Sequence, residues 1–139
     1  MKYMIMLYAS QRDYDQMAGK PSDQPEWKPE AVAEMHEFMG RWNQELIDSG
    51  EFVDAQGLAA PVHTRRIHGL DGGVPVVTDG PYPETQEVLA GYTIVECPSF
   101  DRATEIAARI TTAPSPGESS SPRYVEVRPI DGGSDDFTG

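Results

Sequence analysis

Cysteine is almost absent from this chain of 139 residues. Cys97 is the single one, so no disulfide can form within the chain. It can be a reactive thiol or a small residue at the end of a strand, and we interpret it as the latter. The sequence also lacks the clustered Cys and His residues that bind zinc, so we expect no metal site. The apolar first segment, 1–8, is too short for a signal peptide or a membrane span, and a cytoplasmic protein is expected.

Positive charge is scarce as well. Lys and Arg total 11 against 23 Asp and Glu, which gives a formal net charge of -12. Phosphate binding needs clustered cations, and so does attraction to an anionic membrane, so nucleic acid and membranes are not expected partners. The length allows one domain with one core. We expect that domain over residues 1–130, followed by a flexible tail, 131–139.

Two segments have the apolar periodicity of amphipathic helices. The first begins at Pro29, which suits the first turn of a helix, and ends before Gly50, which suits a left-handed stop. Its apolar stripe recurs at spacings of three and four: Val32, Met35, Met39, Trp42 and Leu46. The second helix begins at Ser99 or Asp101, either of which can cap it. Its buried face is predicted to be Ala103, Ile106, Ala107 and Ile110.

The remaining apolar segments have the length and alternation of strands. They are residues 3–8, 51–58, 64–70, 74–78, 88–96 and 123–130. The pair 64–70 and 74–78 flanks Asp71-Gly72-Gly73, which indicates a hairpin. Residues 9–28 are polar and without periodicity, so we expect a long loop there, either a lid or disordered. The segment 114–121 is expected to be a flexible connector.

The resulting order is β-α-β-β-α-β with one extra hairpin, which indicates an α+β domain of the ferredoxin-like kind. Right-handed crossovers place both helices on one face of an antiparallel sheet. The other face then carries apolar side chains that nothing in the chain covers. Such a surface usually marks an interface, and we expect a symmetric homodimer that buries it.

The most distinctive motif is an acidic turn followed by a short polar stretch. It reads Asp79-Gly80-Pro81-Tyr82-Pro83-Glu84-Thr85-Gln86-Glu87, with Gly91-Tyr92 just beyond. This segment resembles the DGPF branch of the YCII-related family, named for an Asp-Gly-Pro-Phe turn. Here Tyr82 stands for Phe and Gln86 for Lys. The resemblance covers most of residues 1–8 and 42–130 and implies a dimeric α/β barrel.

The resemblance also implies two classes of function. Some YCII-related proteins are thought to use a His–Asp pair, and one branch eliminates chloride from a chlorinated aromatic metabolite. The first hypothesis is therefore a small-molecule acid–base enzyme of the isomerase or lyase type, acting without a cofactor at the dimer cleft. The alternative is a non-catalytic ligand-binding or regulatory module, because DGPF proteins are often associated with sigma-factor-type transcription regulators. A third interpretation is an acidic loop that only solubilises an assembly subunit.

The candidate catalytic residues are Asp79 and His63. Asp79 either caps a turn or places a carboxylate at the rim of a pocket. His63 precedes a strand whose partner leads into Asp79, which makes it the preferred partner, although a plain loop residue is the competing interpretation. His36 and His68 are expected on the surface. The candidate substrate-binding residues are Tyr82, Glu84, Thr85 and Tyr92, whose competing roles are a solvated acidic loop and sheet packing.

Overall fold

A computed structural model describes residues 1–20, 27–114 and 124–132 and has the α+β architecture that the sequence predicts. A four-stranded sheet has the order β2-β5-β1-β6. Its strands are β1 (Lys2–Ala9), β2 (Phe52–Gly57), β5 (Val88–Glu96) and β6 (Val125–Pro129). Every neighbouring pair is antiparallel. The sequence-based strands at 3–8, 51–58, 88–96 and 123–130 all overlap these elements.

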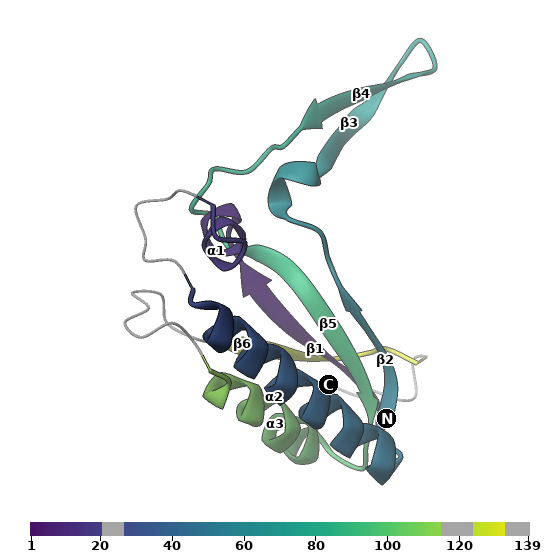
Figure 1. Ribbon diagram of the computed structural model, residues 1–139. Helices are drawn as coiled ribbons and strands as arrows, with labels where there is room; N and C mark the ends of the chain where they lie inside the picture. The colour runs from purple at the N-terminus through teal and green to yellow at the C-terminus, as the bar shows by residue number, and fades with distance from the viewer. Residues whose placement is uncertain (21–26, 115–123, 133–139) are drawn as a thin grey trace.

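Two helices lie side by side across one face of this sheet (Figure 1). Helix α2 (Pro29–Ser49) has Pro in its first turn and ends at Gly50, whose φ of 78° is left-handed. Helix α3 (Phe100–Ala108) is capped by the Ser99 hydroxyl, which accepts a hydrogen bond from the Arg102 amide. A short 3-10 turn, η2 (Arg109–Thr112), follows α3. The predicted start and stop of α2 and the predicted cap of α3 at Ser99 are confirmed.

The hydrophobic core fills the layer between the helices and the sheet. Its buried members include Tyr3, Ile5, Trp42, Leu46, Val95, Ala103, Ile106, Ala107 and Ile110. Trp42 is the largest of the fully buried side chains, and its indole N–H donates to the carbonyl of Ile106 at 3.0 Å. This bond joins α2 to α3 inside the core, where an unpaired indole N–H would be costly.

The opposite face of the four-stranded sheet is left open. Strand alternation turns Tyr3 and Ile5 toward the helices, so Met4 and Met6 point to the other side, together with Ile94 of the neighbouring strand. These side chains are half-buried, and no described element of the chain packs over them as a layer (Figure 1). We call this surface the open face.

Residues 11–17, which the sequence analysis assigned to a long loop, form helix α1 (Gln11–Met17). Its N-terminus is a capping box: the Ser10 hydroxyl accepts from the Asp13 amide, and the Asp13 carboxylate accepts from the Ser10 amide. The loop prediction is therefore wrong for this part of 9–28. The remaining part includes residues 21–26, which lie outside the described residues, as do most of the predicted connector and of the predicted tail.

A two-stranded arm projects from the body of the molecule (Figure 1). It consists of the 3-10 turn η1 (Pro61–His63), strand β3 (Arg65–Asp71) and strand β4 (Val74–Asp79). The predicted turn is confirmed, and Gly72 and Gly73 supply the positive φ angles that it needs. Apolar side chains on the arm are exposed, Leu70 to 74% and Val74 to 64%.

Candidate functional site

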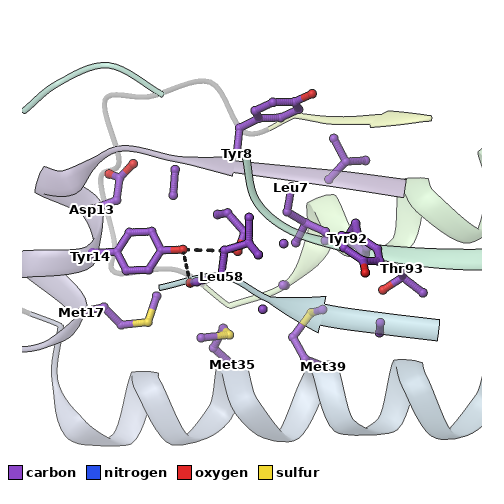
Figure 2. Close-up of a pocket in the computed structure, with 18 of the residues that line it drawn as sticks. Leu7, Tyr8, Asp13, Tyr14, Met17, Met35, Met39, Leu58, Tyr92 and Thr93 are labelled. Carbon is purple, nitrogen blue, oxygen red and sulfur yellow. Dashed lines mark hydrogen bonds between the residues drawn. The ribbon is translucent and has the colours of Figure 1, made fainter. Parts of the chain in front are cut away.

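A cavity of the described structure lies where α1 and α2 meet the end of the four-stranded sheet. Its volume is about 670 Å³, which is within the usual range for pockets that hold small organic molecules. Strands β1, β2 and β5 supply one wall through Leu7, Gly57 and Gly91. Figure 2 shows Leu7 pointing down from β1 into this space, with Met35 and Met39 rising from α2 on the far side.

The apolar stripe of α2 is divided between the core and this cavity. Its C-terminal half, Trp42 and Leu46, is buried in the core. Its N-terminal half, Met35 and Met39, is only partly buried and lines the cavity. Met17 of α1 adds a third methionine (Figure 2). These unbranched, polarizable side chains suit an apolar surface that adapts to a guest.

Tyr14 holds α1 against the sheet at the edge of the cavity. Its hydroxyl donates to the carbonyl of Leu58 at 2.9 Å and lies 3.3 Å from that of Ala90 (Figure 2). The two carbonyls follow β2 and begin β5, so one side chain joins three elements. Burial raises the pKa of the Tyr14 phenol, which therefore remains a hydrogen-bond donor at neutral pH.

Two further tyrosines form an aromatic pair near the end of β1. The Tyr8 ring points away from Met35 and Met39, to the other side of β1 (Figure 2), and its hydroxyl donates to Met6 Sδ at 3.6 Å on the open face. The rings of Tyr8 and Tyr124 are stacked, with centroids 5.7 Å apart and an interplanar angle of 24°. A hydrogen bond to Glu126 raises the pKa of Tyr8 to about 12, and a hydrogen bond to Glu87 raises the pKa of Tyr124. Both phenols therefore keep their protons, and a carboxylate lies at the hydroxyl end of each ring.

The charged groups that line the cavity are all acidic among the described residues. Asp13 and Glu87 belong to the lining, and none of the described lining residues is Lys, Arg or His. Asn43 lines the cavity too, and its Oδ1 is buried without a hydrogen-bond partner in the described structure. An unpaired buried acceptor costs about 1–3 kcal/mol. The described lining is thus apolar, with two acidic side chains.

The predicted catalytic residues lie on the arm rather than in this cavity. Asp79, the last residue of β4, forms an ion pair with Arg65 at 3.2 Å, and the two side chains are 79% and 74% exposed. His63 ends η1 and is exposed. The backbone does run nearby, because the Gly80 amide donates to the carbonyl of Thr64 at 2.8 Å. The catalytic role of this pair stays a prediction.

The predicted substrate-binding residues separate into two groups. Tyr92 lines the cavity, and its hydroxyl reaches Asp54 at 3.4 Å. Tyr82 lies under the guanidinium of Arg66, which is 5.4 Å from its ring centroid. Glu84 and Thr85 are exposed on the loop between β4 and β5. Of this group, the structure brings only Tyr92 to the described cavity wall.

The other histidines are placed as expected. His36 is exposed on α2, and His68 is exposed on the arm, where its Nε2 lies 2.7 Å from the Thr78 hydroxyl. Within the described ranges, His, Cys, Asp and Glu side chains form no group of three or more that could hold a metal ion. The helices of the described parts include none long and apolar enough to cross a membrane.

Sequence reasoning missed most of the cavity. Tyr14 and Met17 lie in the segment that the sequence analysis predicted to be a loop. Ser10 and Asp13 have the spacing of a capping box, which is a signal of a helix start in this segment. Met35 and Met39 were recognised, but as members of a continuous core stripe. Nothing local distinguishes them from Trp42 and Leu46, because the difference depends on what packs opposite.

The chain matches a known protein family over most of its length. A family model described as the YCII-related domain matches residues 1–128. An uncharacterized protein of Rhizobium meliloti (strain 1021) is 39% identical over 59 residues. That similarity covers 42% of this chain and 43% of the relative, so the match spans less than half the length of either protein.

Proposed function

The chain belongs to the YCII-related family, and we propose that it binds a small organic molecule in the cavity between α1, α2 and the end of the sheet. The observation that carries this proposal is the cavity itself, about 670 Å³ in volume and lined by methionines, tyrosines and strand backbone. Apolar pockets with a few convergent polar groups are the usual form of a small-molecule site.

The polar groups of the cavity are better suited to binding a ligand than to catalysing proton transfer through a histidine. Burial raises the pKa of the Tyr14 phenol, so this group is neutral near pH 7, and its hydroxyl donates to the carbonyl of Leu58. No histidine is among the described residues of the lining. Ligand binding is therefore the function that this geometry supports best.

Occupancy of the cavity can be tested with a neutral, apolar fluorescent probe, N-phenyl-1-naphthylamine. Met39→Trp fills the cavity from α2 and is expected to weaken probe binding by at least about tenfold. Ile47→Trp makes a comparable increase in size on the same helix, at a position that is 51% exposed and outside the cavity lining. Equal probe affinity in the two variants, with folding verified by circular dichroism, would rule out this site.

An acid–base reaction of the isomerase or lyase type at Asp79 and His63 is a second proposal, at a separate site. The hydrogen bond from Gly80 to Thr64 supports it, because it holds the segment after Asp79 beside the residue after His63. Asp79→Asn should abolish turnover of an identified substrate, while Asp71→Asn at the tip of the arm should not. Full turnover by the Asp79 variant would exclude that role.

The assembly that we propose is a homodimer of ferredoxin-like subunits in the cytoplasm. The strand order and the position of both helices on one face of the sheet support the ferredoxin-like topology. A single buried cysteine that forms no disulfide supports a cytoplasmic location, where thiols are kept reduced. The open face, with Met4, Met6 and Ile94, supports the dimer. Met6→Glu should yield monomers in sedimentation equilibrium and Ile47→Glu should not. A wild-type protein that stays monomeric at high concentration would refute the dimer.

A non-catalytic module that binds a sigma-factor-type transcription regulator is the alternative function. The exposed apolar side chains of the arm support it, since Ile67, Leu70 and Val74 are 61%, 74% and 64% exposed. In a pull-down with such a regulator, Leu70→Asp should release the partner, whereas Met39→Trp should not. Retention by the Leu70 variant would show that the arm is not the contact.

A further inference from the structure

Resting on the small-molecule site proposed above, we propose that helix α1 couples the cavity to the projecting arm, so that a bound ligand stabilises the base of the arm. Helix α1 lies at the end of the sheet from which the arm projects (Figure 1). Part of the helix lines the cavity, and its first residues are bonded to the segments that lead to and from the arm. The exposed apolar side chains of the arm, such as Leu70, are then displayed in a ligand-dependent way.

The cavity side of α1 gains contacts when a ligand binds. Tyr14 and Met17 line the cavity (Figure 2), yet α1 contains no buried residue. A ligand in the cavity touches these side chains only while the helix is docked against the sheet. A ligand stabilises the state that it binds, so at ten times its dissociation constant the population of undocked helix falls about tenfold.

The N-terminal end of α1 holds the base of the arm by hydrogen bonds. The side chain of Gln11 accepts from the amide of Val62 at 2.9 Å, in η1 just before β3. The amide of Arg12 donates to the carbonyl of Glu84 at 3.1 Å, in the loop after β4. Gln11 is itself fixed within the helix, because its Nε2 donates to Asp15 at 2.8 Å. Both segments that connect the arm to the body are therefore bonded to one short helix.

Tyr14 contacts the same two segments where they leave the sheet. The last register pair of β2 and β5 is Gly57 with Gly91. The next residues, Leu58 and Ala90, are joined by a hydrogen bond of 2.8 Å from the Leu58 amide to the Ala90 carbonyl. The Tyr14 hydroxyl reaches the carbonyls of both residues. A residue of the cavity lining is thus bonded to the segments that carry the arm.

The arm itself has little to hold it in place among the described residues. Every residue of β3 and β4 is exposed, and an isolated two-stranded hairpin is only marginally stable in water. At the base, the Gly80 amide donates to the Thr64 carbonyl at 2.8 Å, and the exposed ion pair of Arg65 with Asp79 adds little. Order at the base of the arm therefore depends on the docking of α1, and a short helix without buried residues opens locally with ease.

Amide hydrogen exchange followed by NMR tests this coupling. It is measured without N-phenyl-1-naphthylamine and with the probe at ten times the dissociation constant found for each protein. Two amides report on the two ends: Ala18, which donates to the Tyr14 carbonyl at the end of α1, and Gly80 at the base of the arm. In the wild type the probe should slow the exchange of both amides by about fivefold or more.

Three variants test the route through α1. Gln11→Met keeps the size of the side chain and removes its acceptor oxygen, so the probe should still slow Ala18 while its effect on Gly80 falls by about twofold or more. Gln11→Glu keeps an acceptor oxygen and should behave as the wild type. Gln44→Met is the matched control, because Gln44 is exposed on α2, lies outside the cavity lining and makes the same kind of intrahelical bond, 2.9 Å to Asp48. It should leave both effects unchanged.

The outcomes distinguish the coupling from the proposed function. Slower exchange at Ala18 with unchanged exchange at Gly80 in the wild type would overturn the coupling and leave the cavity as a binding site. An undiminished effect on Gly80 in Gln11→Met, or an equal loss in Gln11→Met and Gln44→Met, would overturn the route through α1, provided that circular dichroism shows folded variants. Failure of the probe to bind the wild type would refute the proposed function and the coupling together.

Discussion

The hydroxyl of Tyr14 lies 2.9 Å from the carbonyl oxygen of Leu58, across 44 positions of the chain. This contact fastens α1 to the end of the sheet, beside the cavity. The same hydroxyl lies 3.3 Å from the carbonyl of Ala90, which also accepts a hydrogen bond from the Leu58 amide. A short helix with no buried residue of its own is thus held by this phenol together with two further hydrogen bonds. The Val62 amide donates to Gln11 Oε1 at 2.9 Å, and the Arg12 amide donates to the carbonyl of Glu84 at 3.1 Å.

Tyr14→Phe should loosen α1 without unfolding the domain. The substitution keeps the ring and removes the donor to Leu58, so the free energy of unfolding should fall by about 1 kcal/mol. Urea denaturation measures that loss, and hydrogen exchange should show faster opening of the α1 amides. Tyr92→Phe is the matched control, since its hydroxyl makes a longer contact, 3.4 Å to Asp54. Equal effects of the two variants would contradict the proposed role of Tyr14.

Two tryptophan substitutions should distinguish the contribution of the core to stability from that of the cavity to binding. They are Trp42→Phe and Trp27→Phe. Trp42→Phe leaves the Ile106 carbonyl without its donor and a void in the core, which should lower the free energy of unfolding by about 2–3 kcal/mol. Trp27 is partly buried and lines the cavity. Its replacement should cost less than about 1 kcal/mol and weaken binding of N-phenyl-1-naphthylamine. The reverse pattern would show that the two regions are wrongly assigned.

The ion pair between Glu51 and Arg102 should make stability depend on pH in the acid range. Hydrogen bonds from Arg102 lower the pKa of Glu51 from its usual 4.5, and the Glu51 side chain is only 13% exposed. A carboxylate whose pKa is lower in the folded protein than in the unfolded chain stabilises the fold at pH values above its unfolded pKa. That stabilisation is lost as the pH falls through the pKa of the folded protein.

Urea denaturation of wild type and Arg102→Ala between pH 3 and 7 tests this dependence. The two proteins should differ most at pH 7, and the difference should shrink as the pH falls through the lowered pKa of Glu51. Because Arg102 is 43% exposed, solvent screens the pair, and a double-mutant cycle with Glu51→Gln should give a coupling of about 1 kcal/mol or less. Arg41→Ala, in a pair exposed on both sides, is the control and should show little change with pH. A difference that stays the same size from pH 7 to pH 3 would contradict the ionic mechanism.

Cys97 should react slowly while the protein is folded. Its thiol is buried, and that burial raises its pKa, so little thiolate is present at neutral pH. Reaction with 5,5′-dithiobis(2-nitrobenzoate) should therefore be slow in buffer and fast in denaturing urea. Rapid release of thionitrobenzoate by the native protein would instead support the interpretation as a reactive thiol.

The sequence predicts the elements better than it predicts the site. Pro29, Gly50 and Ser99 act through local rules of helix starts and stops, and the structure has those residues at the expected ends. Helix α1 is not predicted from the sequence because seven residues are too few to show a helical periodicity of apolar side chains. Its capping box, however, is a local signal of a helix start. The arm was predicted as a hairpin because Gly72 and Gly73 define its turn.

Local sequence patterns do not predict the cavity, because it is formed by contacts between residues that are far apart in the sequence. Met39 and Trp42 have the same helical spacing, yet α3 packs against Trp42 while Met39 faces the cavity. Asp79 belongs to the most distinctive motif of the sequence. Its position on the projecting arm, away from the cavity lining, follows from how residues 58–65 leave the sheet. Such arrangements require the whole fold.

Gly91 gives the sheet side of the cavity a fixed shape. A Cβ at this position would lie 3.0 Å from the carbonyl oxygen of Gln56 in the adjacent strand, so even alanine would require that part of β2 to shift by a few tenths of an ångström. The helix side, by contrast, is built from the long, freely rotating thioethers of Met35 and Met39. An engineer who wishes to admit larger or smaller guests should therefore edit α2 and leave the strands alone.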